Sequence, residues 1–283
     1  MPAISALPFR LAVCNELFEK RDFAESCRML RKAGWQGLEL APFTLTPDPT
    51  KTTAAERKQI RDIMASEGIA FAGMHWLMVT PPGLHVTTPD AAVRRKSWEF
   101  LDKLIDFCAD LGPNGVMVFG SPKQRSSTGG LSPEDATRYF IEGMASIAPH
   151  AAARGVTICI EPLSASQADV LLSLEEAAAI VKQIGSPSIQ TIYDPHNAVD
   201  EKEPPEVLVN RYFEIIRHVH LNELDGTYPR PGGGYNFRPV LQVLKNRGYA
   251  GWLSMEIFDF SPGAEKIITE AGAYLRDEIS KLA

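Results

Sequence analysis

The chain has 283 residues, of which 45% are hydrophobic and 23% are charged, a balance typical of ordinary globular proteins. Its net charge is −6 and its pI is near 5.6, which disfavours a protein that binds nucleic-acid backbones, because such proteins carry clustered basic residues. No apolar stretch approaches the roughly 20 residues of a membrane span. The four cysteines lack C-x-x-C spacing, and Cys14, Cys108 and Cys159 lie inside apolar runs, so we expect these three to be core residues and not disulfides. The fourth cysteine is Cys27. Together with an N-terminus unlike a signal peptide, this favours a cytoplasmic protein.

Eight short apolar runs follow one another along the chain. Several are nearly continuous, as in parallel strands covered on both faces. The runs are 9–15, 37–41, 70–77, 115–121, 156–162, 189–195, 216–222 and 252–257. Between most of them lie longer segments with the 3.6-residue apolar periodicity of helices. These segments are 23–34, 54–68, 91–112, 132–155, 173–185, 237–248 and 263–282.

This alternation, without a low-complexity linker, predicts an α/β fold: a single (β/α)8 TIM barrel domain over residues 1–283. A doubly wound open sheet is the alternative, but it normally has a glycine-rich phosphate loop after the first strand. Residues 14–18 read Cys-Asn-Glu-Leu-Phe instead. The run Pro-Arg-Pro-Gly-Gly-Gly at 229–234 follows the seventh strand and is a candidate mobile loop.

Acidic or imidazole side chains stand at the ends of the last four apolar runs: Glu161, Asp194, His220 and Glu256. Each of them alone is compatible with an isolated polar group capped by a backbone N–H or by water. Because the carboxyl ends of barrel strands meet at one mouth, however, we expect the four to lie together. Three neighbouring carboxylates would repel one another, and a divalent cation relieves that repulsion. With no thiolate in the set, the predicted cofactor is one Mn²⁺, Mg²⁺ or Co²⁺ ion, with Mn²⁺ the first choice.

Four motifs around these residues resemble the xylose isomerase-like barrels, especially the ketose 3-epimerases and the related sugar phosphate isomerases and epimerases. The motifs are I-E-P at 160–162, Y-D-P-H-N at 193–197, H-V-H-L-N-E at 218–223 and M-E-I at 255–257. The resemblance spans nearly the whole chain. It implies one divalent metal on the four ligands, a sugar substrate and a homo-oligomer. It also implies that Glu161 and Glu256 are the acid/base pair, which transfers a proton beside a metal-bound carbonyl of a ketose or keto-sugar.

The resemblance extends to substrate contacts. His196 and Arg230 match substrate-binding positions, although the family motif has one more residue before the histidine and the loop around Arg230 is longer here. Gln167 stands where the epimerases carry a second glutamate, and glutamine cannot titrate. His75 and Trp76 end the third run and are predicted to line the pocket, where Trp76 would cover the apolar face of a sugar.

Three further regions are expected near the mouth. Glu39 ends the second run and is predicted as a mouth residue, and Glu16 lies on the same side. His218 is predicted to support His220 from one layer deeper, because alternate residues of a strand share a face. Tyr228 and Tyr235 flank the glycine-rich loop and are candidate entrance residues.

The leading functional hypothesis is a metal-dependent sugar isomerase or epimerase of carbohydrate metabolism. A metal-dependent lyase or dehydratase on the same barrel is the alternative, because Gln167 departs from the epimerase pattern and His75 is available. An endonuclease IV-like nuclease would need a three-zinc cluster, which six histidines in all and an acidic pI disfavour. A non-catalytic scaffold should have lost ligands that this chain retains. We therefore expect a sugar partner, and neither nucleic acid nor a membrane.

Overall fold

Eight parallel strands close into a barrel in chain order in the computed structural model, which describes residues 7–18 and 20–283. The strands are β1 (Arg10–Cys14), β2 (Gly37–Leu40), β3 (Ala70–Met74), β4 (Val116–Phe119), β5 (Thr157–Ile160), β6 (Ile189–Tyr193), β7 (Ile216–Leu221) and β8 (Trp252–Met255). The ring closes where β1 pairs with β8, with Arg10 opposite Trp252. The predicted (β/α)8 barrel is confirmed, and each strand lies inside its predicted run.

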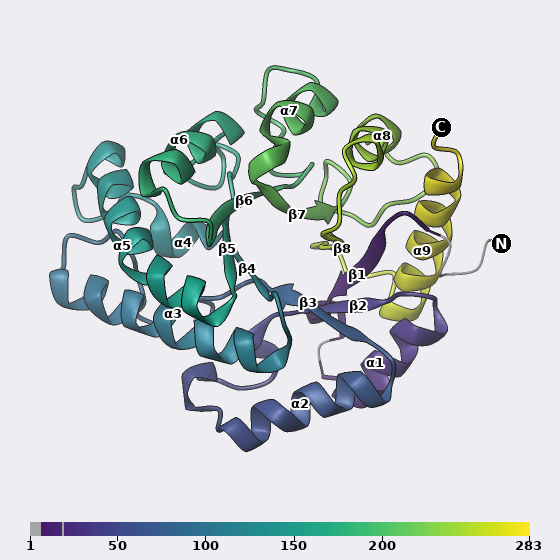
Figure 1. The fold of residues 1–283 in the computed structure, drawn as a ribbon, viewed down its shortest axis with the longest axis horizontal. Helices are drawn as coiled ribbons and strands as arrows, with labels where there is room; N and C mark the ends of the chain where they lie inside the picture. The colour runs from purple at the N-terminus through teal and green to yellow at the C-terminus, as the bar shows by residue number, and fades with distance from the viewer. Residues whose placement is uncertain (1–6, 19) are drawn as a thin grey trace.

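Helices surround the ring of strands (Figure 1). They are α1 (Phe23–Lys32), α2 (Ala54–Ser66), α3 (Ala91–Leu111), α4 (Pro122–Arg125), α5 (Pro133–Arg154), α6 (Leu174–Ile184), α7 (Pro205–Tyr212), α8 (Arg238–Asn246) and α9 (Ala264–Ser280). Two of them have no counterpart among the predicted segments. The helix α4 is a single turn, and α7 has eight residues, so neither is long enough to display a clear apolar period.

Local capping explains where the longer helices begin and end. Ser132 accepts a hydrogen bond from the backbone N–H of Asp135 at the start of α5, and Pro133 occupies the first helical position. Ser173 caps α6 in the same way by accepting from the N–H of Glu176. Both helices end at a glycine in the left-handed region, the conformation that favours this residue.

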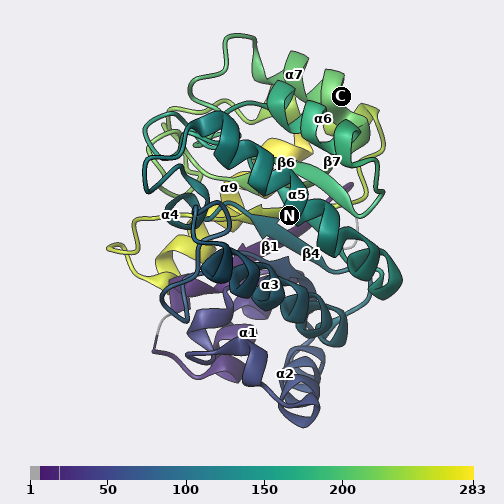
Figure 2. The same cartoon turned by 90° about the vertical axis from the view of Figure 1, so that its left-hand side faces the viewer.

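The helices α3 and α5 lie side by side over β4 (Figure 2). Trp98 of α3 stacks on Phe119 of β4, with ring centroids 6.4 Å apart, and Phe140 of α5 completes the cluster. A Cβ on Gly143 would lie 1.8 Å from the Trp98 ring, so only glycine allows α5 to approach so closely. Cys14, Cys108 and Cys159 are free and buried, as predicted, and so is Cys27.

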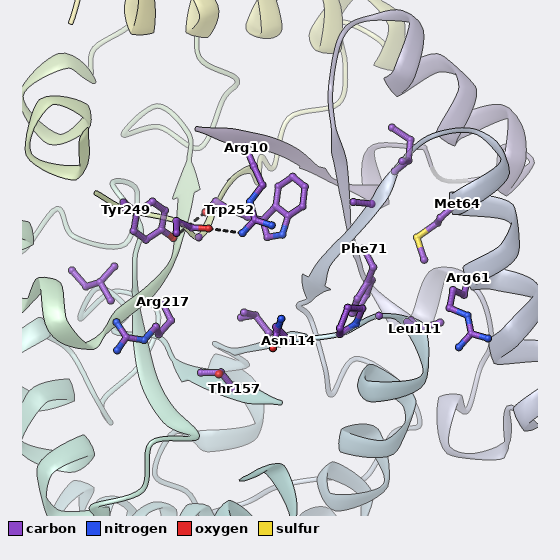
Figure 3. Close-up of a pocket in the computed structure, with 18 of the residues that line it drawn as sticks. Arg10, Arg61, Met64, Phe71, Leu111, Asn114, Thr157, Arg217, Tyr249 and Trp252 are labelled. Atoms are coloured by element: carbon purple, nitrogen blue, oxygen red, sulfur yellow. Dashed lines mark hydrogen bonds between the residues drawn. The ribbon is translucent and has the colours of Figure 1, made fainter. Parts of the chain in front are cut away.

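The two ends of the barrel differ in their cavities. A cavity of about 760 Å³ lies at the amino ends of the strands, with Arg10, Thr157 and Trp252 among its lining residues (Figure 3). None of the predicted site residues lines it. A second cavity, of about 420 Å³, opens at the carboxyl ends. Among the described residues, no helix is both long and apolar enough to cross a membrane.

Candidate metal centre and active site

The structure brings the four predicted ligands together at the carboxyl end of the barrel. Glu161, Asp194 and Glu256 are the first residues after β5, β6 and β8, respectively. His220 lies within β7. One ligand atom from each residue lies within 4.8 Å of the others. The Nδ1 of His220 is 3.0 Å from Glu256 Oε2, 3.3 Å from Asp194 Oδ2 and 3.7 Å from Glu161 Oε1. All four side chains are buried.

The two ring nitrogens of His220 have different surroundings. Nε2 lies 3.3 Å from Glu39 Oε1, whereas Nδ1 is buried without a hydrogen-bond partner and faces the three carboxylates. A histidine that donates one N–H to a carboxylate presents the lone pair of its other nitrogen, which is the arrangement of histidines that ligate metals. The unpartnered Nδ1 and the oxygen-rich donor set therefore fit a divalent cation.

Glu39 lies beneath this cluster and not at the mouth, which corrects its predicted place. Its side chain is fully buried, and Oε2 is 2.8 Å from Nε2 of His218. Burial alone would raise the pKa of Glu39, but His218 and His220 hold it well below its usual range. His218 is fully buried as well and lies beside Glu39 in this deeper layer.

Two side-chain amides donate hydrogen bonds to the carboxylates of the predicted ligands. Asn222 Nδ2 donates to both oxygens of Asp194, at 3.2 and 3.1 Å, and Asn197 Nδ2 donates to Glu161 Oε1 at 3.0 Å. Gln167 in turn donates to Asn197 Oδ1 at 2.8 Å. The roles of the two asparagines were not predicted, although both stand inside the quoted motifs, two or three residues beyond a predicted ligand.

Arg125 of α4 is a second feature that the sequence did not indicate. Its guanidinium is fully buried and donates to the backbone carbonyls of Phe119 at 3.2 Å, Glu161 at 2.7 Å and Leu171 at 3.1 Å. Burial lowers the pKa of Arg125 to about 10, so its charge is retained at neutral pH. This arginine fixes the backbone that carries Glu161.

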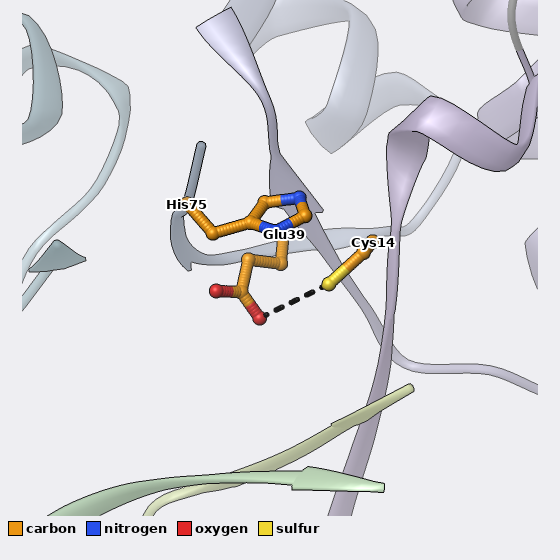
Figure 4. A group of neighbouring side chains, drawn as sticks. All are labelled: Cys14, Glu39 and His75. Atoms are coloured by element: carbon orange, nitrogen blue, oxygen red, sulfur yellow. Dashed lines mark hydrogen bonds between the residues drawn. The ribbon is translucent and has the colours of Figure 1, made fainter. Parts of the chain in front are cut away.

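His75 and Trp76, directly after β3, both contact Glu256. His75 Nδ1 and Trp76 Nε1 lie 3.0 and 2.9 Å from Glu256 Oε1. On its other side, His75 Nε2 is 2.9 Å from Glu16 Oε2. Deeper in the barrel, Cys14 donates to Glu39 at 3.5 Å beside the His75 ring (Figure 4). His75 therefore links the mouth to the buried layer.

The two glutamates differ in their electrostatic surroundings. Burial, together with the nearby carboxylates of Glu256 and Asp194, raises the pKa of Glu161 to about 7. Burial also acts on Glu256, but the facing His220 and His75 lower its pKa below the usual range. One carboxyl can thus exchange a proton near neutral pH while the other stays ionised, an asymmetry suited to acid/base chemistry.

The cavity above the cluster is lined by both glutamates and by most of the predicted substrate contacts. These are His75, Trp76, Gln167 and His196. Apolar side chains, among them Val118 and Phe258, and the β4 loop at 120–124 complete the wall. A Cβ at Gly120 would lie 2.2 Å from Glu161 Oε2, so a larger residue there would displace this carboxylate. The part of this loop in the cavity wall was not predicted.

Arg230 is not among the residues that line the cavity in this structure, so its predicted substrate contact stays a prediction. Its guanidinium bonds to Thr227 Oγ1 and to the carbonyl of Tyr228. Glu223 anchors the glycine-rich loop, because its carboxylate accepts hydrogen bonds from the backbone N–H groups of Arg230 and Tyr235. These bonds hold Arg230 within its own loop.

Comparisons with known proteins agree with this architecture. The ketose 3-epimerase of Arthrobacter globiformis is 22% identical, over 94% of this chain and 93% of that protein. An inosose dehydratase of Klebsiella pneumoniae is 22% identical, over 60% of this chain and 70% of the relative. The match to a 2-oxo-tetronate isomerase of Cupriavidus necator, 26% identical, spans 45% of this chain and only about half of that relative, 52%.

A solved structure with the same fold is the D-psicose 3-epimerase of Clostridium cellulolyticum, crystallised with D-tagatose. Its TM-score is 0.83 at 18% identity, with 97% of this chain and 99% of that chain covered. The family model described as xylose isomerase-like TIM barrel matches residues 27–278. The chain belongs to the xylose isomerase-like TIM barrel family.

Proposed function

We propose that the protein is a divalent-metal-dependent sugar isomerase or epimerase that acts on a ketose or keto-sugar. The observation that carries this proposal is the placement of two glutamates, Glu161 and Glu256, at a metal-binding cluster on the floor of a sugar-sized cavity. The cavity volume of about 420 Å³ lies within the usual range for small-molecule sites. The ketose 3-epimerase relative, aligned over nearly its whole length, supports the substrate class.

In this proposal Glu161, Asp194, His220 and Glu256 would hold a divalent metal, which when bound would supply positive charge beside the substrate carbonyl oxygen. The chain supplies the proton transfer. A carboxylate of the pair removes the proton beside the carbonyl, and the other returns a proton to a different face or carbon. Glu161 and Glu256 both line the cavity, where a bound sugar can reach their carboxylates. Asp194 and His220 serve as metal ligands and move no proton.

A lyase remains the second candidate, since one relative is an inosose dehydratase. It is favoured by Gln167, which supplies an amide where the epimerases carry a carboxylate, and by His75 in the cavity wall. In that reaction the same proton removal is followed by loss of a group from the next carbon.

Deuterium incorporation separates the two reactions. The Mn²⁺-loaded protein is incubated in D₂O with a panel of ketoses and keto-glycosides, and the products are followed by NMR. An epimerase or isomerase places deuterium beside the carbonyl of an intact skeleton, whereas a lyase releases an enone or an aglycone.

The matched variants are Glu256→Gln and, as a control with the same chemical change on the exposed face of α9, Glu265→Gln. Glu256→Gln should abolish deuterium incorporation and Glu265→Gln should retain it. Deuterium incorporation by Glu256→Gln at the wild-type rate would contradict the assigned proton carriers.

A further inference from the structure

Trp76 has a combination of features that its sequence position does not explain. Its backbone φ is +51°, in the left-handed region that bulky side chains rarely adopt. Its ring is 41% exposed, although large aromatic side chains are usually buried. A costly backbone conformation around an exposed ring is not accounted for by core packing. Such strain gathers at functional sites, where the surrounding structure maintains it.

The indole N–H of Trp76 is directed at the candidate metal centre. Nε1 donates to Glu256 Oε1 at 2.9 Å, while the other oxygen, Oε2, lies 3.0 Å from Nδ1 of His220. The two oxygens of this carboxylate therefore have separate environments. Oε1 is held by Trp76 and His75, and Oε2 faces the cluster.

The ring itself is supported from two sides. Phe43 and Phe258 meet it edge-on, each with ring centroids 6.4 Å away. Trp76 and Phe258 both line the cavity of about 420 Å³. These contacts fix the ring plane, so the N–H cannot turn away from Glu256 without loss of packing.

We propose that Trp76 is a positioning residue, which fixes the carboxylate of Glu256 so that Oε2 is presented to the metal. This inference rests on the proposed metal-dependent function. It goes beyond the predicted role of Trp76 as a cover for the sugar ring. Residues that hydrogen-bond to metal ligands orient them and strengthen metal binding, and their loss typically weakens metal affinity or activity by about 10- to 100-fold.

The test is the affinity for Mn²⁺, measured by isothermal titration calorimetry on metal-free protein without any substrate. Trp76→Phe keeps an aromatic ring in the cavity wall and removes the N–H donor. We expect its Kd for Mn²⁺ to rise about tenfold or more. The metal-free variant should melt within about 2 °C of the wild type, because the residue is exposed.

Trp98→Phe is the matched control. It also removes an indole N–H that is hydrogen-bonded, in this case to the carbonyl of Val86 at 3.2 Å and not to a predicted metal ligand. Its Kd for Mn²⁺ should equal that of the wild type. If Trp76→Phe binds Mn²⁺ as tightly as Trp98→Phe, the positioning role is refuted while the metal site stands. If the wild-type protein binds no Mn²⁺, the proposed function fails with it.

Discussion

At the scale of single residues, the site depends on the unequal environments of the two nitrogens of His220. Burial alone would lower the pKa of this imidazole, but Glu256 and Glu39 raise it well above its usual value in the metal-free protein. In the metal-free protein these carboxylates favour the protonated form of the ring. Metal binding requires the unprotonated Nδ1, so it must release that proton.

The pH dependence of Mn²⁺ binding follows from this exchange. Because the pKa of His220 is raised and that of Glu161 is about 7, the site holds more protons at pH 6 than at pH 8. The Kd should fall as pH rises, by about tenfold per pH unit for each proton released. Calorimetric titrations at pH 6, 7 and 8 measure the Kd for Mn²⁺. A Kd that is constant over this range would show that no proton leaves these groups.

The residues that sequence could identify are those whose chemistry is specific and whose position in the strand is fixed. Glu161 and Glu256 follow buried strands directly, so their placement at the mouth could be predicted from the fold alone. Asn197 could not be assigned in the same way, since its amide acts through Glu161 and Gln167, and such a role depends on three-dimensional contacts. Glu39 was predicted to lie at the mouth, because its position near a strand end does not reveal that His218 and His220 contact its carboxylate inside the barrel.

At the scale of elements, the single-turn helix α4 ties together segments that lie far apart in sequence. Its Arg125 donates to carbonyls at the end of β4, just beyond β5, and at Leu171. The loops of a barrel mouth have few regular hydrogen bonds of their own, and a planar guanidinium with five donors can satisfy several carbonyls at once. The element is too short to have been recognised from periodicity, yet it fixes the backbone of Glu161.

Arg125→Met should therefore destabilise the protein. The carbonyl of Glu161 would be left buried and unpaired, whereas those of Phe119 and Leu171 would each keep one hydrogen bond from a backbone N–H, so the free energy of unfolding should fall by about 2 kcal/mol. Urea denaturation of the metal-free protein measures the change. Arg138→Met, on the exposed face of α5, is the control and should lose less than about 1 kcal/mol. Equal losses in the two variants would show that the buried bonds of Arg125 contribute little.

At the scale of the whole molecule, the order of strands and helices could be predicted because each parallel strand is buried on both faces and reads as an apolar run. The helix α7 was not predicted for a physical reason: it begins at the second residue of the proline pair Pro204-Pro205, and its eight residues are too few to show an apolar period. The barrel brings the ends of β5 to β8 to one mouth, which turns four separate polar residues into one site.

That convergence is the central claim, and its direct test is the Mn²⁺ content of the protein. Wild-type protein and Asp194→Asn are dialysed against Mn²⁺, then against metal-free buffer, and the retained ion is measured by atomic absorption. We predict about one ion per chain in the wild type and a marked loss in Asp194→Asn, because an amide oxygen is a weaker ligand than a carboxylate. No retained ion in the wild type, or full retention by Asp194→Asn, would contradict the four-residue metal centre.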